Sequence, residues 1–191
     1  MKKTVILASM LLLPSALLLP MSSMAASYTI DPTHTYPNFT VDHLGFSTLH
    51  GRFGKTTGKL TMDQAKGIGS VDIVIDAASI DTGFKKRDDH LRSPDFFNAV
   101  EFPEITFKST KVTFEGKGAT VVGDLTIMGV TKSVSLAVPS INCGVHPFNK
   151  KQVCGFDATT QLKRSDFGMK YGLPAVGDII NLTIEVEATK D

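Results

Sequence analysis

The 191-residue chain contains no tryptophan, only two cysteines and no excess of charge of either sign. The chain has 20 basic and 19 acidic residues, so it lacks the excess of positive charge typical of proteins that bind nucleic acid or an anionic membrane surface. Two cysteines cannot complete a four-thiolate zinc site. A G-x-S-x-G nucleophile elbow and a phosphate-binding glycine loop are also missing. The sequence therefore offers no familiar catalytic signature.

Only one long apolar run is present, and it lies near the amino terminus, from Val5 to Leu19. Two lysines precede it, and small residues follow it at the spacing that signal peptidase recognises. The run is interrupted by Pro14 and is shorter than the ~20 residues that span a bilayer. The pattern predicts a signal peptide at residues 1–25, cleaved after Ala25, and a secreted protein with no stable membrane anchor.

Cleavage after residue 25 of 191 leaves 166 residues, the size of one domain spanning residues 26–191. In these residues Cys143 and Cys154 flank a connection of ten residues that contains proline and asparagine. The spacing does not fit a C-x-x-C redox pair, and the compartment is oxidising. We therefore predict a structural Cys143–Cys154 disulfide, which stabilises the fold by roughly 3 kcal/mol.

Helical periodicity is almost absent from the predicted mature chain. Apolar and polar residues instead alternate with period two, which is typical of half-buried strands. No helix alternates with the strands, so a parallel α/β sheet is excluded. The alternating runs cover residues 34–43, 49–62, 71–80, 104–114, 120–127, 134–138, 156–162 and 180–188.

Two of these runs are too long for ordinary strands and change phase partway along. We expect one bend as a bulge at Thr56–Gly58 and another between Ile105 and Phe114. A sandwich and a barrel both fit the alternation, but bent strands and inward glycines favour the barrel. The predicted fold is all-β: an elongated, eight-stranded antiparallel barrel with one short helical cap between strands 3 and 4.

The cap is predicted in residues 81–98, between the third and fourth runs. Charged residues are concentrated in Lys85–Arg92, Pro94 then blocks helix continuation, and the apolar pair Phe96-Phe97 follows. We interpret the segment as a lid on the barrel. An ion pair between Asp88 and Arg92, at the favourable i to i+4 spacing, is the simplest interpretation of its charges.

Apolar side chains share the inward phase along most of the strands. An ordinary filled core and a tunnel for an apolar chain both fit this pattern. Enlarging Ala158 or Gly123 distinguishes the two, because the change would overpack and destabilise a filled barrel, whereas a tunnel would tolerate the change and lose its ligand. The side chains predicted to line the interior and contact a lipid are Phe39, Val41, Phe53, Ile73, Ile75, Phe96, Phe107, Leu125, Leu136 and Phe156.

The five histidines, at positions 34, 43, 50, 90 and 146, have no recognised metal-ligand spacing. His34 and His43 are nine residues apart and fall on opposite faces of a regular strand. We predict no metal site, and histidines that hydrogen-bond locally. An acid–base site at Asp88, Asp89 and His90 is the enzymatic alternative.

Several blocks of sequence resemble the YceI-like family. They are His43-Leu44-Gly45-Phe46-Ser47 with Gly51-Arg52-Phe53, then His90-Leu91-Arg92-Ser93 with Asp95-Phe96, then Gly123-Asp124-Leu125-Thr126 with Gly129-Val130-Thr131-Lys132, and finally Lys163-Arg164-Ser165-Asp166-Phe167-Gly168. The resemblance covers essentially all of the predicted mature chain. It implies a lipocalin-like barrel, usually periplasmic, that binds long polyisoprenoid or other amphiphilic lipids. It supplies no catalytic residues, and the cysteine loop is not part of the shared pattern.

The leading hypothesis is a periplasmic carrier or store for a long apolar lipid, such as an isoprenoid quinone or polyprenyl compound. This hypothesis requires no cofactor other than the bound lipid, no catalytic residue and no nucleic acid, and it leaves a homodimer possible. The alternatives are a filled barrel that acts as a stress or interaction protein, and the acid–base enzyme.

Overall fold

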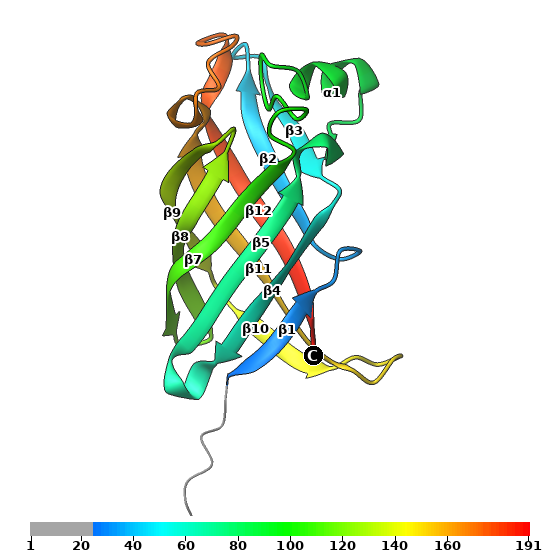
Figure 1. Cartoon of the computed structure of the whole chain (residues 1–191), viewed down its shortest axis with the longest axis vertical. Coiled ribbons are helices and arrows are strands. Elements are labelled where there is room, and N and C mark those ends of the chain that lie inside the picture. Colours follow the sequence, from blue (N-terminus) through cyan, green and yellow to red (C-terminus); the bar gives the residue numbers. More distant parts are fainter. Residues whose placement is uncertain (1–24) are drawn as a thin grey trace, which may run out of the picture.

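The structure, a computed structural model, describes residues 25–191, which form antiparallel strands with one α-helix at one end (Figure 1). The predicted signal peptide lies outside the described residues except for Ala25. The strands are β1 Ala26–Ile30, β2 Tyr36–His43, β3 Ser47–Phe53, β4 Thr56–Asp63, β5 Ile68–Asp76, β6 Ile80–Asp81, β7 Glu104–Glu115, β8 Gly118–Ile127, β9 Val130–Val138, β10 Ile141–Val145, β11 Gln152–Lys163 and β12 Val176–Lys190. The helix is α1 Lys85–Leu91, and three 3-10 turns are η1 Gln64–Lys66, η2 Ala77–Ser79 and η3 Arg164–Phe167.

The strands close into the predicted eight-stranded barrel because β11 and β12, which are far apart in the strand order, also pair with each other. The long strand β12 pairs with β11 along one edge and with both β1 and β2 along the other. The short strands β1 and β2 together therefore fill one position in the barrel wall, and β3 and β4, which pair with them, fill the next. The wall continues through β5, β7, β8 and β9 to β11.

Both long runs are broken, one of them not where the sequence suggests. The predicted bulge at Thr56–Gly58 is wrong: the chain leaves β3 after Phe53 and enters β4 at Thr56, and β4 then pairs with β5 without a register shift. The break lies at Gly54–Lys55, where the backbone hydrogen-bonds to Ser79 and Asp76 of the neighbouring bend. The second bend is confirmed by a register shift between Ser109 and Lys111 in β7.

The predicted disulfide is confirmed. Cys143 and Cys154 are directly opposite in the β10–β11 pair, and their sulfurs are bonded. Cys154 is 1% exposed and packs in the apolar cluster at that end of the barrel, whereas the tip of the hairpin is exposed. The bridge therefore ties a projecting hairpin to the barrel wall.

The predicted cap is confirmed as α1, which lies over one end of the barrel, the upper end in Figure 1. The expected Asp88–Arg92 ion pair is wrong. Asp88 is buried, and its carboxylate accepts hydrogen bonds from the backbone N–H and hydroxyl of Thr82. Arg92 pairs instead with Asp89 and donates to the carbonyls of Ala78 and Ile80, so it fastens the helix to the wall.

No helix within residues 25–191 is long and apolar enough to cross a membrane.

Candidate ligand-binding cavity

The barrel encloses an apolar cavity of about 400 Å³. This volume lies in the range of about 300–1,000 Å³ that small-molecule sites occupy. Residues from both ends of the barrel line it, from Met62 and Phe114 near the η1 end to His90 and Tyr171 near α1. The wall is almost entirely hydrocarbon, and no aspartate or glutamate of residues 25–191 contributes to it. The arrangement can hold an elongated apolar molecule.

All ten side chains predicted to line the interior do line this cavity. They come from seven different strands and the segment after α1, so the period-two pattern assigned their inward orientation correctly around most of the wall. Their contact with a lipid stays a prediction. They are Phe39, Val41, Phe53, Ile73, Ile75, Phe96, Phe107, Leu125, Leu136 and Phe156.

Glycines on the inward phase make room for phenylalanine rings. A Cβ at Gly51 would lie 2.3 Å from the ring of Phe39, and a Cβ at Gly123 would lie 2.5 Å from the ring of Phe107. The rings therefore lie against bare backbone on the neighbouring strand, in the way that aromatic side chains shield strand glycines. The expectation that a tunnel tolerates a larger residue at Gly123 is wrong, because the new side chain would strike Phe107 before it reached the cavity.

Aromatic rings gather where the cavity meets the surface. His90 and Tyr171 both line the cavity and remain exposed, so the cavity reaches the surface beside them. The rings of His90, Phe96 and Tyr171 pack edge-on, with centroids 5.0–5.4 Å apart. Phe97 packs edge-on against Phe53, so both members of the apolar pair after the helix lie against other rings.

Arg164, on η3, organises the loop that supplies Tyr171. The residue is 5% exposed, and its guanidinium donates to four backbone carbonyls, those of Met169, Tyr171, Val176 and Gly177, at 2.8–3.0 Å. Burial lowers the pKa of Arg164, and the nearby Asp178 partly opposes this. The side chain thus acts as a rigid cationic frame for the loop rather than as a free charge in the cavity.

Sequence reasoning missed this loop as part of the cavity wall. It contributes Arg164, Phe167, Met169 and Tyr171 to the lining, but it has no strand periodicity from which an inward phase can be derived. The one usable signal is the Lys163–Gly168 block, which matches the family pattern. Thr56, a polar residue on an inward phase, was also missed.

Of the three residues in the proposed acid–base site, Asp88 and Asp89 do not line the cavity. The carboxylate of Asp88 accepts a hydrogen bond from the backbone N–H of Thr82. Asp89 forms ion pairs with Lys85 and Arg92 on the outside of α1. Only His90 faces the cavity, and its Nε2 lies 2.9 Å from Asp95. These residues therefore do not converge on one point where a reacting group could sit.

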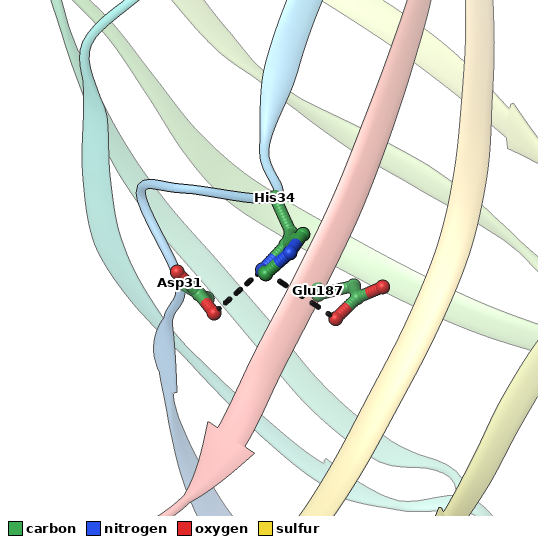
Figure 2. Close-up of side chains that lie close together, drawn as sticks. All are labelled: Asp31, His34 and Glu187. Atoms are coloured by element: carbon green, nitrogen blue, oxygen red, sulfur yellow. Dashed lines mark hydrogen bonds and ion pairs between the residues drawn. The ribbon is translucent and has the colours of Figure 1, made fainter. Parts of the chain in front are cut away.

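A separate polar cluster lies on the outside of the barrel, where Asp31 and His34 belong to the β1–β2 turn and Glu187 projects from β12 (Figure 2). His34 Nδ1 is 3.0 Å from Asp31 Oδ2 and 4.0 Å from Glu187 Oε2. Thr33 donates to the other Asp31 oxygen. The three ligand atoms lie within 4.8 Å of one another, but His34 is exposed and already bonded within its own turn, so we interpret the cluster as a clasp on the turn.

The clasp predicts a measurable histidine titration. The hydrogen bond between the His34 imidazole and the Asp31 carboxylate raises the pKa of His34 above its usual 6.5. Hydrogen bonds from Thr33 and His34 lower the pKa of Asp31 to about 2. The contribution of His34 to stability is therefore present below about pH 6.5 and is lost as pH rises through its raised pKa. That of Asp31 is present above about pH 4 and is lost as pH falls toward 2.

Asp31→Asn should lower the pKa of His34 toward 6.5, as followed by an NMR pH titration of the imidazole signals. Glu187→Gln is the matched control and should lower that pKa by less, since this carboxylate lies farther from Nδ1. If the pKa of His34 were unchanged in the Asp31→Asn protein, the clasp would not exist in solution.

A closed antiparallel barrel with one helix over its end and an apolar interior defines a lipocalin-like fold. The YceI-like domain model matches residues 28–188 of the chain. The protein belongs to the YceI-like family.

Two relatives illustrate the match. Protein YceI of Escherichia coli O17:K52:H18 (strain UMN026 / ExPEC) is 38% identical over 172 residues, covering 88% of this chain and 90% of the relative. A UPF0312 protein of Pseudomonas aeruginosa (strain LESB58) is 37% identical over 193 residues, covering 100% and 99%. The similarity therefore extends over almost the whole length of both relatives.

Solved structures share the fold. Burkholderia cenocepacia BcnA superposes with a TM-score of 0.75 at 27% identity, covering 84% of this chain and 99% of that one. A polyisoprenoid binding domain from Saccharophagus degradans, implicated in plant cell wall breakdown, gives a TM-score of 0.63 at 17% identity and covers 88% and 100%. At 17% identity, the likeness to this second structure shows a shared fold and nothing more.

Proposed function

We propose that this protein is a periplasmic carrier or store for a long apolar lipid, an isoprenoid quinone or polyprenyl compound, held inside the barrel. The observation that carries the proposal is the cavity of about 400 Å³, to whose wall no carboxylate of residues 25–191 contributes. Burial of apolar surface releases about 25 cal/mol per Å². A long prenyl chain can therefore bind tightly without any charged contact.

Three further observations support the proposal. Family membership and a structural neighbour described as a polyisoprenoid binding domain agree with a lipid ligand. The disulfide agrees with an oxidising compartment, as expected if residues 1–25 are a cleaved signal peptide. The proposal includes that cleavage and the export of residues 26–191 as one domain.

The alternatives have less support. A filled barrel conflicts with the cavity. A catalytic role would have to rely on His90 and its partner Asp95, and of these two only His90 lines the cavity. We propose a binding protein without enzymatic activity.

The proposal predicts that lipid co-purifies with the protein. The protein should be purified without detergent from the periplasm of cells that make it naturally, extracted with organic solvent and analysed by mass spectrometry. We expect one prenyl lipid at close to one molecule per protein. An unrelated periplasmic protein purified in the same way is the control, and an extract as empty as that control would contradict the proposal.

A further inference from the structure

The end of the barrel that carries α1 exposes large apolar side chains. Phe46 is 89% exposed, and Leu44, Phe84 and Tyr171 are each about half exposed. Leu44 and Phe46 lie in the β2–β3 turn, Phe84 precedes α1, and Tyr171 lies in the loop between η3 and β12. All three segments are at the upper end of the molecule in Figure 1. We call these four residues the mouth rim, and apolar side chains exposed together in this way mark a contact surface.

The mouth rim adjoins the opening of the cavity. Tyr171 itself lines the cavity. The ring of Phe84 lies 5.8 Å from the guanidinium carbon of Arg87, which is also a lining residue. The N–H of Leu44 donates to the carbonyl of Ala175, so the β2–β3 turn is joined to the loop that carries Tyr171. A surface that covers the mouth rim therefore also faces the cavity opening.

The β2–β3 turn holds its apolar side chains in a strained conformation. Leu44 and Gly45 have φ angles of 59° and 71°, a region that glycine and asparagine adopt easily and leucine rarely does. The N–H of Gly45 is bonded to the Asp42 carboxylate, and the N–H of Phe46 to the carbonyl of His43. A leucine in a strained, half-exposed position adds little to the fold, as expected if its side chain contacts something outside the chain.

Free positive charge accompanies the mouth rim. Lys86 and Lys170 are exposed, and neither forms an ion pair or a side-chain hydrogen bond within residues 25–191. The carboxylates of Asp89 and Asp95, in contrast, are both paired. Exposed aromatic rings beside free lysines fit the head-group layer of an anionic bilayer. The rim is built from three separate turns and not from one flat face, so a fluid surface suits it better than a second protein.

Resting on the proposed function, we propose that the mouth rim docks on a bilayer that contains anionic phospholipid, with Leu44 and Phe46 inserted among the head groups. The cavity then opens toward the membrane, and an apolar lipid passes between the two without crossing water. Burial of a few apolar side chains supplies reversible docking and needs no stable anchor.

The absence of tryptophan from the chain allows a direct test, because a single introduced tryptophan reports only its own surroundings. Phe46→Trp places the reporter in the mouth rim. Phe148→Trp is the matched control, since Phe148 is 88% exposed on the β10–β11 hairpin at the opposite end (Figure 1). Each protein is mixed with vesicles of phosphatidylcholine and phosphatidylglycerol with brominated acyl chains. Fluorescence of the Phe46→Trp protein should shift to shorter wavelength and be quenched, and that of the control should do neither.

Binding to the same vesicles without bromine is measured by co-sedimentation. Phe46→Ser should weaken it by about tenfold, and Phe148→Ser should stay within about twofold of wild type. Lys86→Gln should weaken it by about fivefold, but should have no effect with phosphatidylcholine alone. Phe46 does not line the cavity, so the Phe46→Ser protein should retain as much bound lipid as wild type after purification.

Three outcomes would overturn the proposal. Quenching of the Phe148→Trp protein as strong as that of the Phe46→Trp protein would remove the preference for this end of the barrel. Quenching of neither would exclude the bilayer as the partner. A doubled mass of the wild-type protein in light scattering, abolished by Phe46→Ser, would show that a second copy covers the rim. Bound lipid is measured separately, so a protein that holds lipid but ignores vesicles contradicts the docking and leaves the carrier function standing.

Discussion

Replacing Ala158 with phenylalanine should expel the lipid while the barrel remains folded. Ala158 lies on β11, is 2% exposed and lines the cavity, so its new side chain would occupy space that the ligand needs. Displacing about 60 Å² of buried ligand surface lowers affinity about tenfold at 25 cal/mol per Å². A phenylalanine ring is large enough to displace more than that. Lipid per protein, measured by solvent extraction and mass spectrometry, should fall accordingly.

The neighbouring residue Thr159 supplies the control. It is exposed on the outside of the same strand, so Thr159→Phe should retain the lipid. Stability must be compared after delipidation, because a bound ligand itself stabilises the fold. In a solidly packed barrel, Ala158→Phe would cost about 1–3 kcal/mol through overpacking. Such a loss in the lipid-free protein, with no change in bound lipid, would contradict the account.

Replacing Arg164 with methionine should strongly destabilise the fold. Four carbonyls would lose their donor in a buried site, and breaking a buried charged network of this kind costs about 3–5 kcal/mol. The loop that carries Tyr171 to the cavity mouth should loosen as well. Urea denaturation measures the first effect, and the dissociation rate of bound lipid, which should rise, measures the second.

Arg52→Met is the matched control for Arg164→Met. Arg52 is half exposed, lies 3.7 Å from Asp81 and rests over the ring of Tyr36. Exposed ion pairs contribute about 0–1 kcal/mol, so this change should cost less than about 1 kcal/mol. If the two variants lost similar amounts of stability, the buried guanidinium of Arg164 would not organise the loop.

The barrel was predictable because alternation is a local property of a half-buried strand. Each long run of inward side chains became a part of the wall, and the Ser109–Lys111 bend followed from a phase change within one run. The break at Gly54–Lys55 was misplaced because the sequence shows only that the phase changes between Phe53 and Leu60. The residue at which it falls depends on how the backbone meets the bend at Ser79, which is a tertiary contact.

The cavity wall was predictable only where it consists of strands. Period two assigned Phe39 and Phe156 to the interior, but no period exists in the loop that contributes Arg164 and Tyr171. The role of Asp88 was misjudged for a similar reason. The spacing of Asp88 from Arg92 suggested a surface ion pair. In the fold, Thr82 lies close to the start of the helix and donates two hydrogen bonds to the buried Asp88 carboxylate instead.

A crystal structure of the protein purified without detergent from cells that make it naturally tests the central claim most directly. The account predicts continuous, elongated electron density along the cavity between Phe107 and Tyr171, with the shape of a single prenyl chain. A barrel whose interior held only separate water molecules, or whose side chains had closed the space completely, would contradict it.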